Sequence, residues 1–242
     1  MAANSMGYLQ IDIPQITRNI ASFGPTLSAI IISLIVYGRE GLRRTLNGLG
    51  KWRLNPVWYL LIFLGPSIVG LIAIGINSSL GGTIPSFFQF YPFSMLPVIF
   101  LYVLILGGAL GEEIGWRGYA LPRLSRKPGR IMGTLLLGFL WGVWHLPLFF
   151  IEGSPQAAVP FPVFLVQTTC LSVVYSWLFY NTGSVLIALL FHASNNTTAG
   201  ILPVLPLPET GGTIQIYYIF NALLVIISVI LLTKSDTFNG KT

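Results

Sequence analysis

The chain has 242 residues, of which 54% are hydrophobic and only 8% charged, and its mean hydropathy is +0.77. A soluble globular domain carries about 25% charged residues, so this composition excludes a soluble domain and indicates an integral membrane protein. The net charge is +6, from 13 Lys and Arg against 7 Asp and Glu. Most basic residues fall in short loops between apolar runs, where they indicate membrane orientation. We therefore expect no nucleic-acid partner.

Other features of the sequence favour one membrane domain. Cys170 is the only cysteine, which excludes disulfides within the chain and Cys-x-x-Cys metal sites. Residues 1–21 have no continuous apolar core, so we expect no signal peptide. No internal repeat, low-complexity tract or linker divides the chain. Residues 1–242 are therefore predicted to form a single integral membrane domain.

Apolar runs of about 20 residues can cross a bilayer as helices, and the chain contains about seven such runs. The predicted spans are residues 22–38, 57–76, 95–121, 131–151, 161–181, 183–200 and 214–233. The fold prediction is an all-α, polytopic membrane protein whose helices enclose a polar cavity within the membrane. In the third run, Gly107, Gly111 and Gly115 are spaced by four, which predicts a face that a neighbouring helix approaches closely.

The basic residues predict the orientation. Eleven of the thirteen lie in segments 39–53 and 122–130 or in the tail from Lys234 onwards. With seven spans these three segments share one side of the membrane, which the positive-inside tendency makes cytoplasmic. We therefore expect the N-terminus outside and the C-terminus in the cytoplasm.

The third run contains two adjacent carboxylates, Glu112 and Glu113, and then Arg117. Ionisable groups at membrane depth are costly and mark cavities, ion pairs or chemistry. Glu113 precedes Arg117 by four residues, so these two can pair on one helix face, which leaves Glu112 without an ionic partner. Such a carboxylate in a low-dielectric site suits a general base. The alternative is a helix end with a purely structural Glu113–Arg117 pair.

Both histidines of the chain, His145 and His192, also lie in apolar runs. A lone histidine in a helix is more often a packed or hydrogen-bonded residue than a catalyst. His192 and Asn196 share one helix face, and their alternative role is hydrogen bonding between helices. At about 1.5 Å per residue, the estimated depths allow both histidines and Glu112 to meet in the inner half of the bilayer. The combination favours a catalytic site.

At these residues the sequence resembles the CPBP family, the CAAX-protease and bacteriocin-processing (Abi) intramembrane proteins that include the type II CAAX prenyl endopeptidases. The family pattern is E-E-x-x-x-R, then F-x-x-x-H, then H-x-x-x-N on successive membrane helices. Here the three parts are Glu112-Glu113 to Arg117, Trp141 to His145, and His192 to Asn196. The resemblance covers about residues 95–200, the motif-bearing core. Trp141 departs from the pattern's Phe, and we expect this larger aromatic to reshape the substrate groove.

The resemblance implies an intramembrane glutamic endopeptidase in which Glu112 and His145 activate a water. His192 and Asn196 would stabilise the oxyanion, while the Glu113–Arg117 pair would hold the site together or contact the substrate. The implied partners are the lipid bilayer and a peptide or protein substrate within or at the membrane. Most bearers of the pattern are prokaryotic, so we expect a prokaryotic plasma membrane and assign no prenylated substrate.

We expect no cofactor for this mechanism, although one metal-dependent alternative stays open. Glu112, His145 and His192 could hold zinc with an open fourth position. The preferred mechanism needs no metal, because Asn196 beside His192 resembles a second hydrogen-bond donor to an oxyanion.

Other protease chemistries find less support in the sequence. The zinc motif His-Glu-x-x-His is absent, and the two aspartates, Asp12 and Asp236, lie near the termini. Two other classes of function remain as alternatives. One is a proton-coupled transporter, against which the chain shows no two-fold internal repeat. The other is a non-catalytic membrane partner that protects against a bacteriocin.

Overall fold

The computed structural model describes residues 14–83, 93–208 and 210–239. These ranges form helices joined by short connections, without a β-sheet, which confirms the all-α prediction. Six helical segments within them are long and apolar enough to cross a membrane, so the protein is a polytopic membrane protein. Residues 1–13, where we expected an outer segment without a signal peptide, lie outside the described ranges.

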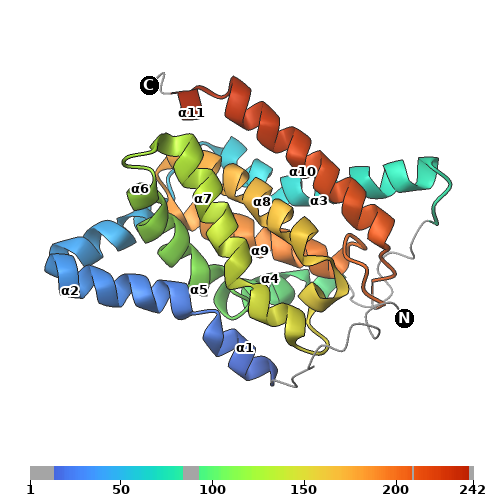
Figure 1. Cartoon of the computed structure of the whole chain (residues 1–242), viewed down its shortest axis with the longest axis horizontal. Helices are drawn as coiled ribbons and strands as arrows, with labels where there is room; N and C mark the ends of the chain where they lie inside the picture. Colours follow the sequence, from blue (N-terminus) through green and yellow to red (C-terminus); the bar gives the residue numbers. More distant parts are fainter. Residues whose placement is uncertain (1–13, 84–92, 209, 240–242) are drawn as a thin grey trace.

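The six segments correspond to six of the predicted spans. They are Gln15–Gly50, Pro56–Ser79, Leu96–Leu124, Gly129–Phe150, Phe161–Thr182 and Ile214–Lys234. The predicted span 183–200 forms α9 (Val185–Ile201), which has only 17 residues. That length gives about 26 Å at 1.5 Å per residue, slightly less than the roughly 30 Å of a bilayer's hydrocarbon core. Figure 1 shows α9 inside the bundle, behind α7 and α8.

The N-terminal half of the described chain contains α1 (Gln15–Ala21), α2 (Gly24–Leu46), the 3₁₀ turn η2 (Asn47–Gly50) and α3 (Pro56–Ser79). The C-terminal half contains α7 (Gly129–Trp144), the 3₁₀ turns η5 (Leu146–Phe150) and η6 (Pro155–Ala158), α8 (Phe161–Thr182), α9, α10 (Ile214–Lys234) and α11 (Asp236–Asn239). α8 packs against α7, α9 and α10, and α9 also packs against α3 and α4. Figure 1 shows α2 and α10 on opposite sides of this bundle.

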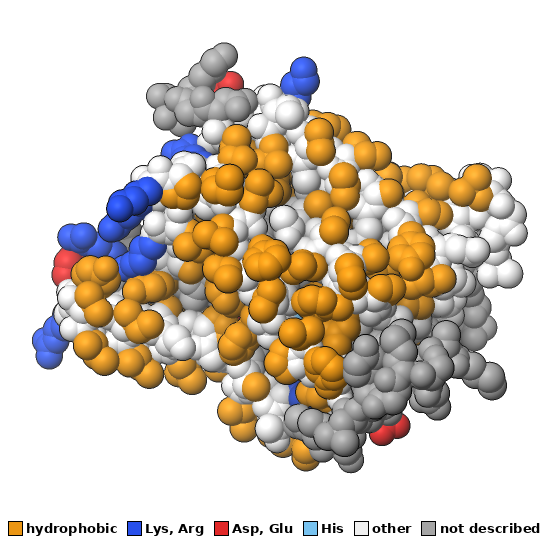
Figure 2. Space-filling model, viewed as in Figure 1, with side chains coloured by type: hydrophobic (Ala, Val, Ile, Leu, Met, Phe, Trp, Pro, Cys, Tyr) orange, Lys and Arg blue, Asp and Glu red, His pale blue; other side chains and the backbone are white. Residues whose placement is uncertain are grey.

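Many large aliphatic side chains face outward, while small residues pack between the helices. Ile35 on α2 is 78% exposed, whereas Ala73 on α3 and Ser172 and Ser176 on α8 are fully buried. In lipid the apolar surface needs no burial, and small residues let helices approach closely. Hydrophobic side chains accordingly spread over most of the face in Figure 2.

The third predicted span is not one continuous helix. It consists of the 3₁₀ turn η3 (Phe93–Met95), α4 (Leu96–Ile105), α5 (Ala109–Glu113), the π-helix η4 (Ile114–Ala120) and α6 (Leu121–Leu124). The chain breaks between α4 and α5 at Gly108, whose φ of +103° disfavours any residue with a side chain. The prediction of a single helix over 95–121 was therefore wrong. The new helix begins at Ala109, three residues before Glu112.

Close packing behind the carboxylates was predicted correctly for two of the three glycines. A Cβ on Gly111 would lie 2.5 Å from the backbone oxygen of Ser22, and one on Gly115 would lie 2.5 Å from that of Pro25. The start of α2 therefore packs directly against α5 and η4, and Thr26 Oγ1 donates to the carbonyl of Leu110 at 3.0 Å. Gly107 does not share this contact, because it lies in the break before α5.

A polar cap fixes the start of α9, the helix that bears His192. α8 ends at Gly183 in the left-handed conformation, and the Ser184 hydroxyl then accepts from the backbone N–H of Ile187. The same hydroxyl donates to the carbonyl of Lys51 at 2.7 Å. Capping of this kind stabilises a helix by about 1 kcal/mol, and here it also ties α9 to the segment after η2.

Candidate active site

One cavity brings together the four side chains for which the family resemblance implies catalytic roles. It has a volume of about 370 Å³, and Glu112, His145, His192 and Asn196 all line it. These residues come from three separate parts of the chain: α5, the end of α7, and α9. Glu113 and Arg117 do not line the cavity; they are fully buried behind it.

Glu112 is held by a hydrogen bond that the sequence pattern did not predict. The indole Nε1–H of Trp141 donates to Oε2 of Glu112 at 2.6 Å, and both residues are buried. Glu112 lacks an ionic partner, as expected, but its carboxylate has a directional donor. Phe, the residue of the family pattern at this position, could not donate this bond. The departure at Trp141 therefore acts on the carboxylate itself.

Glu113 forms the centre of a buried charged group. Its Oε1 accepts from Nη1 of Arg117 at 2.9 Å and contacts Nδ1 of His192 at 2.8 Å. The first contact is the i, i+4 pair predicted from the sequence. The second joins residues 79 positions apart, and helix periodicity cannot reveal it. Glu113 thus links the Arg117 cation to the imidazole of His192.

Two aromatic rings enclose the Arg117 guanidinium. Its central carbon lies 4.7 Å from the centroid of the Trp141 ring and 4.1 Å from that of Tyr175. The negative face of an aromatic ring attracts a cation, more strongly where water is excluded. Tyr175 also packs edge-on against His192. Trp141 therefore contacts both the Glu112 carboxylate and the buried cation.

His145 follows the last residue of α7. Its Nδ1 lies 2.8 Å from the carbonyl oxygen of Trp141. If that nitrogen carries the proton, it donates to the carbonyl and Nε2 is left as an acceptor. The ring also packs against Phe164 of α8, with centroids 5.3 Å apart. His145 is only half-buried, which fits its place in the wall of the cavity.

Two polar atoms converge beside Gly108. A Cβ at this glycine would lie 2.9 Å from Oε1 of Glu112 and 3.6 Å from Nε2 of His192. Oε1 is the oxygen of Glu112 that Trp141 does not bind, and Nε2 is the nitrogen of His192 that Glu113 does not contact. These two atoms therefore share a small space. The missing side chain of Gly108 keeps this space open. Gly108 was not predicted as a site residue, because its role depends on a close approach between helices.

Asn196 lies one helical turn beyond His192 on α9, as predicted. Its Oδ1 accepts from Nδ2 of Asn195 at 3.3 Å, and both amides line the cavity. Across residues 14–83, 93–208 and 210–239, no three His, Cys, Asp or Glu side chains form a ligand set for a metal. The zinc set considered from the sequence, Glu112 with the two histidines, is therefore not gathered as a coordination site.

Further polar side chains in the cavity wall were not predicted from the sequence. They are Gln15, Arg18, Asn19, Gln156, Gln167 and Thr168. Several are held by neighbours: Gln15 donates to Asn19 at 2.7 Å, and Tyr217 donates to Gln167 at 2.9 Å. Isolated amides give no distinct sequence signal. The wall is consequently more polar than the apolar runs suggested.

Comparison with known proteins supports the same core. Residues 94–198 match the family model described as type II CAAX prenyl endopeptidase, Rce1-like. The chain is also 31% identical over 161 residues to CAAX prenyl protease 2 of Methanococcus maripaludis. That alignment covers 62% of this chain and 56% of the relative's length. These matches confirm the family resemblance of the motif-bearing residues.

Proposed function

We propose that this chain, whose residues 94–198 match the family model of the Rce1-like type II CAAX prenyl endopeptidases, hydrolyses peptide bonds inside the membrane. The observation that carries the proposal is the convergence of Glu112 Oε1 and His192 Nε2 on the space beside Gly108, within a polar cavity. A water or a substrate carbonyl in that space would meet a carboxylate on one side and an imidazole on the other. A carboxylate can activate the water, and an imidazole can donate to the oxyanion that forms.

Glu112 is the general base in this proposal. Trp141 holds Oε2, which leaves Oε1 to take a proton from a water that attacks the scissile carbonyl. A general base must lie within hydrogen-bond reach of the proton that it removes. His145, in the same wall, shares the activation of water through its Nε2. The proton taken up is then given to the leaving amine.

His192 and Asn196 stabilise the oxyanion of the tetrahedral intermediate. With Nδ1–H donated to the Glu113 carboxylate, a proton on Nε2 lets His192 donate to the oxyanion. Glu113 holds the ring in that orientation, as a carboxylate orients the histidine of a serine-protease triad. Arg117 holds Glu113 in place from the other side. In this scheme Glu113 and Arg117 position a catalytic group without contacting the substrate.

The test is a Glu112→Gln variant, which keeps the shape of the side chain and removes its basicity. Peptides released by cells with the wild-type protein, with the variant and with no protein are compared by mass spectrometry. We expect peptides that require the wild-type chain to disappear with Glu112→Gln. Glu40→Gln is the matched control, because Glu40 is a half-exposed side chain far from the cavity that pairs with Arg43 and Arg44.

The same variant separates the proposal from its alternatives. A bacteriocin-immunity partner without catalysis would keep its phenotype in Glu112→Gln cells. A proton-coupled transporter would lose transport, but no peptide bond would be cut in the wild type. Either result would reject the peptidase assignment.

A further inference from the structure

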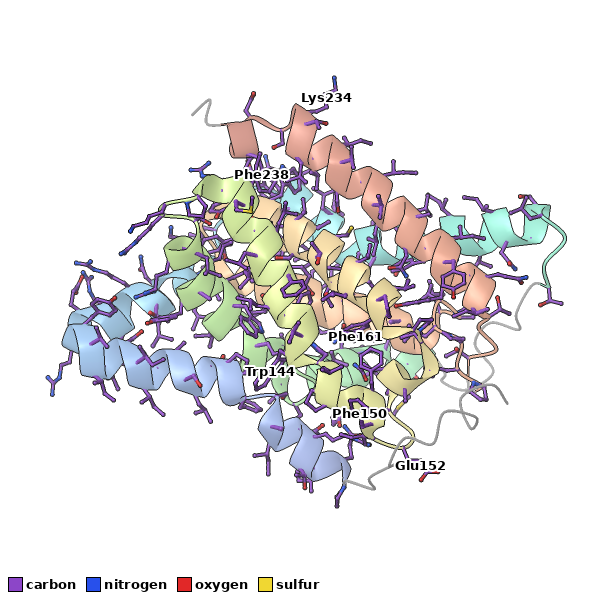
Figure 3. The ribbon with its side chains drawn as sticks, in the orientation of Figure 1. Trp144, Phe150, Glu152, Phe161, Lys234 and Phe238 are labelled. Atoms are coloured by element: carbon purple, nitrogen blue, oxygen red, sulfur yellow. The ribbon has the colours of Figure 1, made fainter. Side chains whose placement is uncertain are left out.

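Tyr175 lies within the charged group behind the cavity, although it belongs to none of the three motifs of the family pattern. It is part of α8, which begins at Phe161 and runs beside α7 (Figure 3), and its side chain is fully buried. The centroid of its ring lies 4.1 Å from the central guanidinium carbon of Arg117, and 5.5 Å and 5.9 Å from the ring centroids of Trp141 and His192. One side chain of α8 therefore contacts a residue from each of the three motifs.

The ion pair between Arg117 and Glu113 uses only part of its capacity for hydrogen bonds. Nη1 of Arg117 donates to Oε1 of Glu113 at 2.9 Å. Within the part of the chain that the structure describes, Nε and Nη2 of Arg117 and Oε2 of Glu113 form no hydrogen bond, although all three atoms are buried. Arginine and a carboxylate frequently meet as a fork, with two parallel hydrogen bonds to the two oxygens. The observed pair is therefore held in a different arrangement.

The rings of Tyr175 and Trp141 account for this arrangement. They lie against the Arg117 guanidinium, with their centroids 4.1 Å and 4.7 Å from its central carbon. An aromatic face attracts a cation, more strongly where water is excluded, so the two rings restrict rotation of the guanidinium. Oε1 of Glu113 is then left in contact with Nδ1 of His192, 2.8 Å away. In a fork with Arg117, this oxygen would turn away from the imidazole.

We infer that Tyr175 is a positioning residue for the reaction: the face of its ring holds Arg117, so that Glu113 keeps the imidazole of His192 directed at the oxyanion. This inference rests on the proposed peptidase function. The hydroxyl of Tyr175 has no part in it, because this buried group forms no hydrogen bond with any described residue. Tyr175 is also not part of the cavity wall. It therefore acts on the rate of the chemical step and not on the binding of substrate.

Three variants separate the ring of Tyr175 from its hydroxyl and from core packing. Tyr175→Leu removes the aromatic face, and Tyr175→Phe keeps it. Phe220→Leu is the matched control, because Phe220 is a buried ring of the same hydrophobic core but lies on α10, outside the cavity wall. The kcat, the KM and the melting temperature are measured on purified protein. The substrate is a synthetic peptide that spans a cleavage site found in the Glu112→Gln comparison.

The expected result is a loss of turnover that depends on the aromatic face. Tyr175→Leu should lower kcat about 10²-fold, roughly the loss that follows removal of one oxyanion donor, and leave KM unchanged. Tyr175→Phe should restore the lost turnover. Phe220→Leu should lower the melting temperature about as much as Tyr175→Leu does, because each loses a buried ring, but it should keep the wild-type kcat.

Three results would overturn the positioning role of the ring. An equal loss of kcat in Tyr175→Phe would assign the effect to the hydroxyl. An equal loss in Phe220→Leu would assign it to core packing, and a raised KM with unchanged kcat would assign it to substrate binding. If Tyr175→Leu melts below the assay temperature, Tyr175→Met takes its place, because a flexible Met side chain fills irregular gaps in a core without an aromatic face.

Nuclear magnetic resonance tests the orientation of His192 without any substrate. The chain has only two histidines, so isotope-labelled histidine gives ring-nitrogen signals from two rings, and a His145→Gln sample identifies those of His192. We expect Tyr175→Phe to keep the wild-type shifts. In Tyr175→Leu the His192 shifts should move toward those of a solvated imidazole at the same pH, because the contact with Glu113 is lost. Unchanged His192 shifts in Tyr175→Leu would overturn the inference.

These outcomes are distinct from failure of the proposed function. Absence of Glu112-dependent cleavage by the wild-type protein would reject the peptidase, and with it a catalytic role for Tyr175. If cleavage depends on Glu112 while Tyr175→Leu keeps both its kcat and its His192 shifts, the peptidase stands and only the positioning role is rejected.

Discussion

The Trp141 indole of α7 and the Glu112 carboxylate of α5, 29 residues apart in the sequence, form a buried hydrogen bond 2.6 Å long. The bond fixes one carboxylate oxygen and leaves the other facing the space beside Gly108. Trp141 also lies against the Arg117 guanidinium. The Trp141 side chain thus joins the motif that begins at Trp141 and ends at His145 to the motif that contains Glu112 and Arg117.

Replacing Trp141 by Phe, the residue of the family pattern, should lower turnover without unfolding the protein. A hydrogen bond to a charged group contributes about 1.5–3 kcal/mol, which corresponds to roughly 10–100-fold in rate at 1.4 kcal/mol for each factor of ten. Turnover and melting temperature are measured on purified protein.

Trp144→Phe is the matched control, since Trp144 is on the same helix and 43% exposed. Its turnover should match that of the wild type. If both variants lose activity equally, or if Trp141→Phe keeps the wild-type turnover, the hydrogen bond does not position the base.

Gly108→Ala should abolish cleavage by filling the space between the base and the imidazole. The added methyl would lie 2.9 Å from Glu112 Oε1, and the positive φ adds backbone strain of about 1–2 kcal/mol. Gly129→Ala separates the two effects, because Gly129 also has a positive φ, of +84°, but no atom within 4 Å of the added carbon. We expect both variants to melt at lower temperature and only Gly108→Ala to lose cleavage. Full activity of Gly108→Ala would show that the reaction takes place elsewhere.

Arg117→Ala should act on stability first. The substitution leaves Glu113 as a buried charge without its cationic partner, and breaking a buried pair in this way costs about 3–5 kcal/mol. The melting temperature in detergent should therefore fall sharply. Arg43→Ala is the control, since the Arg43–Glu40 pair is exposed to solvent and exposed pairs contribute little. An unchanged melting temperature in Arg117→Ala would mean that the pair is not needed for assembly.

Exhaustive chelation tests the role of a metal. If Glu112 activates water directly, purified protein should keep its cleavage rate after treatment with a chelator, and the metal content should be far below one ion per chain. Loss of activity that Zn²⁺ restores would instead support the zinc alternative with Glu112, His145 and His192. Metal analysis and rate are measured on the same sample.

The sequence predicted those relationships that lie within one helix. The Glu113–Arg117 pair and the shared face of His192 and Asn196 follow from residues four apart, and both are present. The links between helices were not predictable in this way. The contact of His192 with Glu113 and the bond of Trp141 to Glu112 depend on how α5, α7 and α9 pack, and hydrophobic periodicity contains no information on that packing.

The break at Gly108 was missed for a related reason. Residues 95–121 are apolar and rich in helix formers, so local propensity favours one continuous helix. The structure interrupts it where the backbone must pass close to Glu112 and His192. Breaks and π-helices within a helix are often found at functional sites, and here both flank the two carboxylates.

The Glu113–Arg117 pair also has a consequence for biogenesis. Both partners belong to one short stretch of chain, and they meet without help from any other helix. The segment can therefore leave the translocation machinery with these two charges already neutralised, before the later helices have been synthesised. A pair divided between two helices would expose an isolated charge to lipid until its partner arrived. His192 reaches Glu113 only afterwards, when α9 is inserted, so the local pair protects the membrane-spanning segment during the interval.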